Sequence, residues 1–110
     1  MVRFLLSASL ALAIAAPLRA ADDKEFICGN VASVVSAIQA ARLDRVSERD
    51  VREKILASDP AWPDRFDNAI VHMTPWVYEQ KMRDVRKKDL GAAFREICAQ
   101  NWQSIAHLYN

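Results

Sequence analysis

Glycine and histidine are scarce in this chain of 110 residues, and both shortages restrict its chemistry. The two glycines, Gly29 and Gly91, stand far apart, so there is no glycine-rich loop to cradle a phosphate. The two histidines, His72 and His107, belong to no HExxH or HxxxH pattern, and the cysteines form no CxxC pair. No serine stands in a GxSxG elbow. The sequence therefore predicts a protein that is not an enzyme and that binds no metal or cofactor.

Strand patterns are missing as well, since no stretch alternates polar and apolar residues with the β-branched enrichment typical of strands. Apolar residues recur instead at three- and four-residue spacing, which is the helical period. Charge is absent from the stretch Phe26–Ala41, although 26% of the whole chain is charged. We predict that this stretch is a buried central helix. Its bulky apolar face consists of Val31, Val34, Val35 and Ile38.

The opposite face of this predicted helix carries small residues that would let a second helix approach closely. They are Ser33, Ser36, Ala37 and Ala40. We expect the neighbour to be the C-terminal helix of the same chain. The alternative is a homodimer, with Ser33 and Ala37 at a two-fold contact.

The N-terminus has the pattern of a secretory signal. Arg3 precedes an apolar run from Phe4 to Ala16, Pro17 is expected to break the helix, and cleavage is expected after Ala20. Ala16 is a second candidate cleavage site, and a retained membrane anchor is the alternative to cleavage. Residues 1–20 are thus predicted to be a signal peptide, and residues 21–110 a single helical domain with no stable membrane insertion.

Export makes a disulfide between Cys28 and Cys98 the expected state of the two cysteines. This bond would close a loop of about 70 residues and stabilise the fold by about 4 kcal/mol. Two free thiols or a metal pair are the alternatives. The mature chain would keep 13 of the 15 basic residues against 14 acidic ones, a net charge near −1 that argues against nucleic-acid binding.

Further helices are predicted along the chain. Ser47 is a good N-cap for a helix over residues 48–57, and a third helix runs from Asp64 to about Met73. Thr74-Pro75 is expected to interrupt it before another helical segment with Val77 and Met82. Asp89 caps a last helix over residues 90–108, whose stripe is Leu90, Phe94, Ile97, Cys98, Trp102, Ile105 and Tyr109. The predicted class is all-α, a small four- to five-helix domain with one disulfide joining the first and last helices.

Two features are candidates for binding a protein partner. Trp62, between two prolines, is either a lid on the core or an exposed anchor. The basic run from Lys81 to Lys88, with Arg83 and Arg86, follows Trp76 and could meet an acidic protein surface or anionic lipid heads. A solvated connection is the simpler interpretation of this run.

The segments ICGNVASVVSAI, ARLDRVSERDV, IVHMTPWVY and AAFREIC resemble those of small uncharacterised periplasmic proteins of proteobacteria. In size, compartment and cysteine placement the chain more distantly resembles the periplasmic immunity proteins that protect bacteria against amidase toxins of type VI secretion. That resemblance implies a helical, disulfide-bridged protein that binds a toxin, but it assigns no binding residues here. We therefore expect a non-enzymatic periplasmic protein-binding protein, an immunity or inhibitor protein. The alternatives are a periplasmic stress chaperone or helper, and a small redox enzyme with a reactive Cys28 or Cys98.

Overall fold

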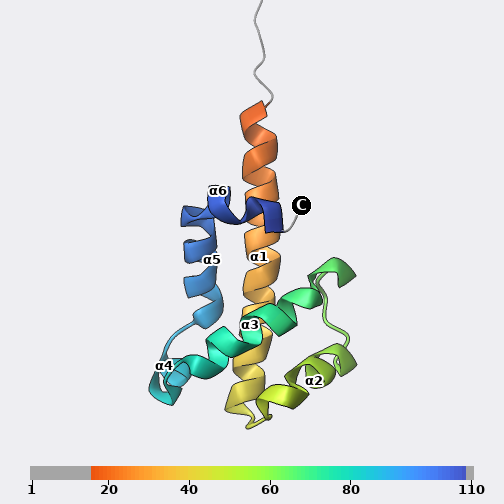
Figure 1. Ribbon diagram of the computed structural model, residues 1–110, viewed down its shortest axis with the longest axis vertical. Helices are drawn as coiled ribbons and strands as arrows, with labels where there is room; N and C mark the ends of the chain where they lie inside the picture. Colours follow the sequence, from red (N-terminus) through yellow and green to blue (C-terminus); the bar gives the residue numbers. More distant parts are fainter. Residues whose placement is uncertain (1–15, 109–110) are drawn as a thin grey trace, which may run out of the picture.

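The computed structural model describes residues 16–108 and is all-α over this range, as predicted (Figure 1). The α-helices are α1 (Ala16–Leu43), α2 (Val51–Ala57), α3 (Asn68–Glu79), α4 (Met82–Lys87), α5 (Leu90–Gln100) and α6 (Trp102–Ile105). Three short 3-10 turns are η1 (Glu48–Asp50), η2 (Asp64–Phe66) and η3 (Ala106–Leu108). A disulfide between Cys28 and Cys98 joins α1 to α5.

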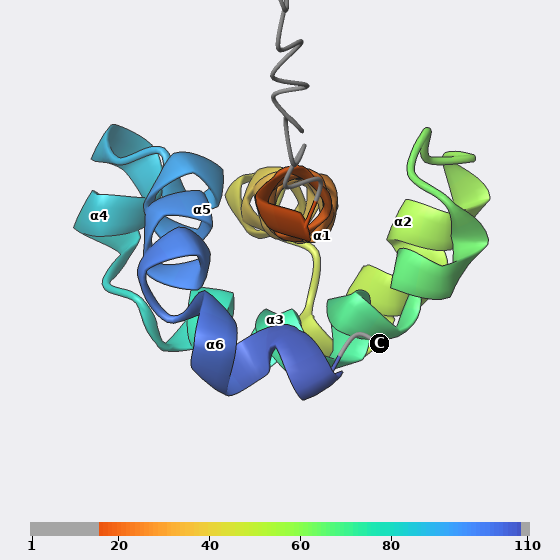
Figure 2. The same cartoon turned by 90° about the horizontal axis from the view of Figure 1, so that it is seen from above.

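Helix α1 is the centre of the fold, and the other helices surround it on three sides. Viewed along α1, α4 and α5 lie on one side, α2 lies on the other, and α3 and α6 cross between them (Figure 2). The predicted core face of Val31, Val34, Val35 and Ile38 is 0% exposed, which confirms the interpretation of the uncharged stretch. The segment Asp23–Leu43 is long and apolar enough to cross a membrane, but its buried valines are those of a core helix.

Helix α1 is longer than predicted and crosses the expected cleavage site after Ala20. The described part of α1 runs from Ala16 to Leu43 and includes Pro17. The expected break at Pro17 concerns the helix before it, which lies outside the described residues. Residues 1–15, which include most of the predicted signal, lie outside the described residues.

The second and third helical segments begin at Glu48 and Asp64 as predicted, but each opens with a 3-10 turn, η1 or η2, before the α-helix itself starts. Ser47 occupies the N-cap position of η1 as predicted, but its hydroxyl accepts no helix N–H and instead donates to the Asp50 carboxylate at 2.6 Å. Helix α3 passes through Thr74-Pro75 without interruption, which corrects the predicted break. Pro75 and Val71 are both exposed, so the carbonyl that loses its helical partner is on the solvent side of α3.

The predicted last helix is divided at Asn101 into α5 and α6. The Asn101 side chain donates to the Ile97 carbonyl at 2.9 Å, and its backbone leaves the helical region. Ile97 is 47% exposed and does not belong to the core stripe, contrary to the prediction. Tyr109 lies outside the described residues. Leu90 and Cys98 are buried as expected.

Candidate binding surfaces

The disulfide fixes α5 against α1 and so positions the surfaces that α4 and α5 present. The Cα atoms of Cys28 and Cys98 are 5.7 Å apart, and both residues are 1% exposed. Thiol–disulfide exchange needs an accessible sulfur, so this burial is typical of a structural bridge.

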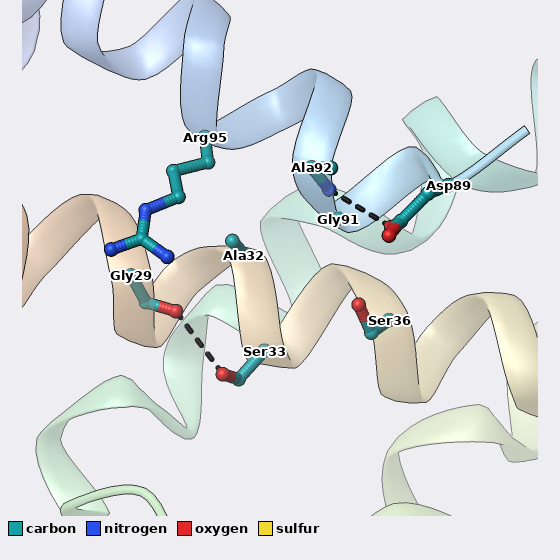
Figure 3. A pocket seen from close by; sticks show the side chains of 8 residues that line it. All are labelled: Gly29, Ala32, Ser33, Ser36, Asp89, Gly91, Ala92 and Arg95. Atoms are coloured by element: carbon teal, nitrogen blue, oxygen red, sulfur yellow. Dashed lines mark hydrogen bonds between the residues drawn. The ribbon is translucent and has the colours of Figure 1, made fainter.

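An open groove of about 240 Å³ lies where α5 meets α1 (Figure 3). Its lining consists of Gly29, Ala32, Ser33, Ser36, Asp89, Gly91, Ala92 and Arg95. A Cβ on Gly91 would lie 2.8 Å from the Ala32 carbonyl oxygen and would collide with the Ser36 hydroxyl. Gly91 therefore sets the close approach of the two helices.

The predicted small-residue face of α1 is thus only partly correct. A neighbouring helix does approach, and it is the intramolecular one, but it contacts α1 at Ala32 and Ser36. Ser33 and Ala40 remain exposed, and Ala37 is half-buried against the core. The C-terminal helix lies further around α1 than expected, because the disulfide at Cys28 draws it toward that side.

Three polar side chains of the groove are already engaged within the protein. The Ser33 hydroxyl donates to the Gly29 carbonyl at 3.1 Å, and an Asp89 carboxylate oxygen accepts from the Ala92 N–H at 3.0 Å, which caps α5 as predicted. Arg95 pairs with Glu25, but both side chains are more than half exposed, so this pair adds little stability. The groove is therefore better described as the contact between two packed helices than as a ligand-binding site.

The strongest charge concentration lies on and around α4, and we call residues 81–88 the basic corner. Its cations are Lys81, Arg83, Arg86, Lys87 and Lys88, and all of them are exposed. Lys88 pairs with Asp84 at 3.6 Å, whereas the other four make no ion pair within the described part of the chain. The predicted partner-binding residues Arg83 and Arg86 therefore point their charge to solvent.

Two side chains of α1 anchor the basic corner. The Gln39 amide donates to the Val85 and Lys88 carbonyls, both at 2.7 Å, and its oxygen accepts from the Leu90 N–H at 3.1 Å. The Arg42 guanidinium donates to the Val77 and Gln80 carbonyls at the end of α3. These bonds engage carbonyls near helix ends, where partners within the helix run out, although the Val77 carbonyl also accepts from the Gln80 N–H at 3.3 Å.

Sequence reasoning missed both anchors, although their position held a signal. Gln39 is the longest polar side chain in the uncharged stretch, and Arg42 is the first charge after it. A long polar group on a buried helix needs a partner, which points to a distant backbone.

Tyr78 fixes the turn after α1 in the same way. Its hydroxyl donates to the Val46 carbonyl at 2.5 Å, and the Arg42 guanidinium carbon lies 5.5 Å from the ring centroid. Burial raises the pKa of Tyr78 above its ordinary value, although the nearby Arg42 charge opposes the rise.

The two tryptophans predicted to bind a partner are half-buried against the core. The Trp62 indole N–H donates to the Asp67 carboxylate at 2.8 Å, and this bond holds the ring in place. Trp76 meets the edge of Phe94 with ring centroids 6.2 Å apart. This packing favours the lid interpretation of Trp62, and partner contact by either ring stays a prediction.

Within residues 16–108, no group of three or more His, Cys, Asp or Glu side chains is placed to hold a metal ion. His72 and His107 are both exposed. The chain matches no known protein family, no curated protein and no solved structure.

Proposed function

We propose that this protein is an exported, non-enzymatic binding protein that holds one specific protein partner. The observation that supports this most is the fixed geometry of the α3–α4–α5 side of the molecule. The disulfide joins α5 to α1, and Gln39 and Arg42 attach the backbone on both sides of α4 to the same helix.

Such fixed geometry favours binding because a preorganised surface loses less conformational entropy in a complex. The backbone of the basic corner is held before any partner arrives, so association would mainly restrict its long side chains. A surface that has to hold one partner gains affinity from this order, whereas an adaptable surface for many clients would not.

The specific form that we propose is an immunity or inhibitor protein against a secreted cell-wall toxin, acting in the periplasm. The N-terminal apolar segment fits a signal peptide, and the disulfide fits an oxidising, exported location. The distant resemblance to immunity proteins of amidase toxins supports the same form.

A stress chaperone is the second candidate, and exposed apolar side chains are the feature that would support it. They are Phe26, Leu43, Leu56, Val71 and Ile97. These residues come from four different helices, and Phe26 rests against Phe66 with ring centroids 5.6 Å apart. A client-binding surface needs a contiguous apolar patch, so specific binding is the better-supported function.

A competition experiment between bacterial cells tests the proposal. A strain that lacks this protein is grown in contact with its parent, and we expect it to be killed. Full-length protein should restore survival, whereas a copy without residues 1–20, which stays in the cytoplasm, should not. Survival of the deletion strain in contact with its parent, combined with sensitivity to heat or acid, would favour the chaperone instead.

A further inference from the structure

We propose that the basic corner is the surface that binds the partner, and that the partner presents a cluster of Asp and Glu side chains to it. This inference rests on the proposed function, because it names the surface and the chemistry of the bound protein.

The first argument is the uneven distribution of charge. Residues 81–88 contain five basic residues and one acidic residue, a net charge of +4. The rest of the predicted mature chain, residues 21–80 and 89–110, contains eight basic and thirteen acidic residues, a net charge of −5. A concentrated charge of one sign on an oppositely charged body attracts a complementary partner and orients it during the encounter.

The second argument is that the backbone of the corner is fixed, whereas four of its five cations make no ion pair within the described part of the chain. Val85 is 1% exposed and packs in the core. It fixes the inner side of α4, and the cations of α4 are exposed on the outer side. Gln39 holds the carbonyls of Val85 and Lys88, as described above. Arg83 and Arg86 are therefore available for the paired hydrogen bonds that a guanidinium makes with a carboxylate.

The third argument distinguishes a protein partner from a membrane. The exposed large apolar side chains of the described chain lie outside residues 79–89, so the corner has none to insert among lipid tails. An extended anionic membrane or nucleic acid would also face the acidic remainder of the molecule. A compact acidic patch on a protein can meet the corner and avoid that repulsion.

A titration with a defined probe tests the inference. The mature protein, residues 21–110, is titrated into a fluorescent polyglutamate peptide, with vesicles of phosphatidylglycerol and phosphatidylethanolamine measured in parallel. We expect the peptide to bind and its affinity to fall as salt rises from about 20 to 200 mM. Vesicles should bind more weakly than the peptide.

Matched variants locate the binding surface. The triple variant Arg83→Gln/Arg86→Gln/Lys87→Gln should weaken peptide binding by about tenfold. The control Arg49→Gln/Arg52→Gln/Lys54→Gln removes three exposed cations from η1 and α2, where carboxylates are interspersed, and should change binding by less than about twofold. Arg83→Lys/Arg86→Lys keeps the charge and should keep most of the binding.

Four outcomes would overturn the inference: no peptide binding at low salt, equal losses in both triple variants, stronger binding of vesicles through the corner, or a concentration-dependent dimer that the corner variant abolishes. The third would assign the corner to a membrane and the fourth to a second copy of the chain.

The cell competition experiment can fail while the peptide still binds the corner. That combination of results would reject the immunity role but would still support the inference that the partner presents acidic side chains to the corner.

Discussion

At the scale of single residues, the shortage of glycine affects the backbone at Arg45 and Asp59. Both have positive φ angles, 62° and 53°, in the left-handed region where glycine is usual. At Arg45 the Val46 N–H bonds the Ala41 carbonyl and the Arg45 N–H bonds the Arg42 carbonyl, each at 3.0 Å. This is the Schellman arrangement that ends a helix, with arginine in the position normally held by glycine.

The variant Arg45→Gly should therefore stabilise the protein. Removal of the Cβ relieves the left-handed strain, and we expect a gain of about 0.5–1 kcal/mol in the free energy of unfolding. Arg45→Ala keeps the Cβ and should give no such gain, which makes it the matched control. Equilibrium unfolding in guanidinium measures both. If alanine stabilised as much as glycine, the lost arginine charge would be the cause instead of the backbone.

The two glycines of the chain are predicted to respond in opposite ways to alanine. Gly91→Ala places a methyl group against Ser36 and the Ala32 carbonyl, and overpacking should cost about 1–3 kcal/mol. At Gly29 the nearest atom to a new Cβ is a side-chain nitrogen of Arg95 at 3.7 Å. Gly29→Ala should therefore stabilise α1 by about 0.5–1 kcal/mol through helix propensity. Urea unfolding of both variants tests this, and a loss of stability at Gly29 would contradict it.

At the scale of elements, the anchoring of α4 by Gln39 should be measurable. Gln39→Ala removes bonds to two carbonyls and one N–H, and we expect a cost of about 2 kcal/mol. Gln80→Ala is the control, because its side chain bonds only the local Trp76 carbonyl and should cost less than about 0.5 kcal/mol. Amide hydrogen exchange at residues 85–90 should accelerate in the first variant alone. Equal exchange in both would show that α4 needs no such anchor.

Reduction of the disulfide tests the connection between α1 and α5. The bond closes a loop across 70 positions of sequence, and its loss should destabilise the fold by about 2–5 kcal/mol. Unfolding with and without reductant measures this, and Cys28→Ala/Cys98→Ala should resemble the reduced protein. Thiol counting on the unreduced, denatured protein should find no free thiol; two reactive thiols would contradict the bridge.

The elements also show how far sequence patterns reach in this chain. The buried face of α1, the burial of Val51 and Ile55 on α2, and the disulfide follow from periodicity and cysteine count, which are local or compositional signals. The continuity of α3 through Pro75 depends on which side of the helix faces solvent, and the division at Asn101 depends on one side-chain hydrogen bond. The periodicity of apolar residues in the sequence predicts neither of these two features.

The basic corner was visible in the sequence as a charged run, but its fixed geometry was not. That geometry depends on Gln39, which lies 46 positions from one carbonyl that it binds and 49 from the other. Contacts across such distances have no signature in a single sequence. The role of Gly91 could not be predicted for the same reason, since it depends on close contact with Ala32 and Ser36 on another helix.

At the scale of the whole molecule, the continuity of α1 across Ala20 bears on export. The core contacts of α1 begin at Ile27 and Cys28, while Asp23 and Glu25 are exposed. Cleavage after Ala20 would therefore leave all the core side chains of the described chain in place. Cleavage would also shorten α1. Asp22, Asp23 and Glu25 would then lie near its first turn, where negative charge is favourable.

We accordingly predict a mature protein that begins near Ala21 and that is as stable as the uncleaved chain. Mass spectrometry of the protein from the periplasm should show the loss of residues 1–20, and guanidinium unfolding midpoints of residues 21–110 and of the full chain should agree within error. Asp22→Asn/Asp23→Asn should destabilise the mature form by about 0.3–1 kcal/mol and leave the uncleaved form unchanged, because only cleavage brings these carboxylates near a helix N-terminus. Recovery of the chain with Met1 attached, in the membranes of cells with active signal peptidase, would show instead that the N-terminal segment is a retained anchor.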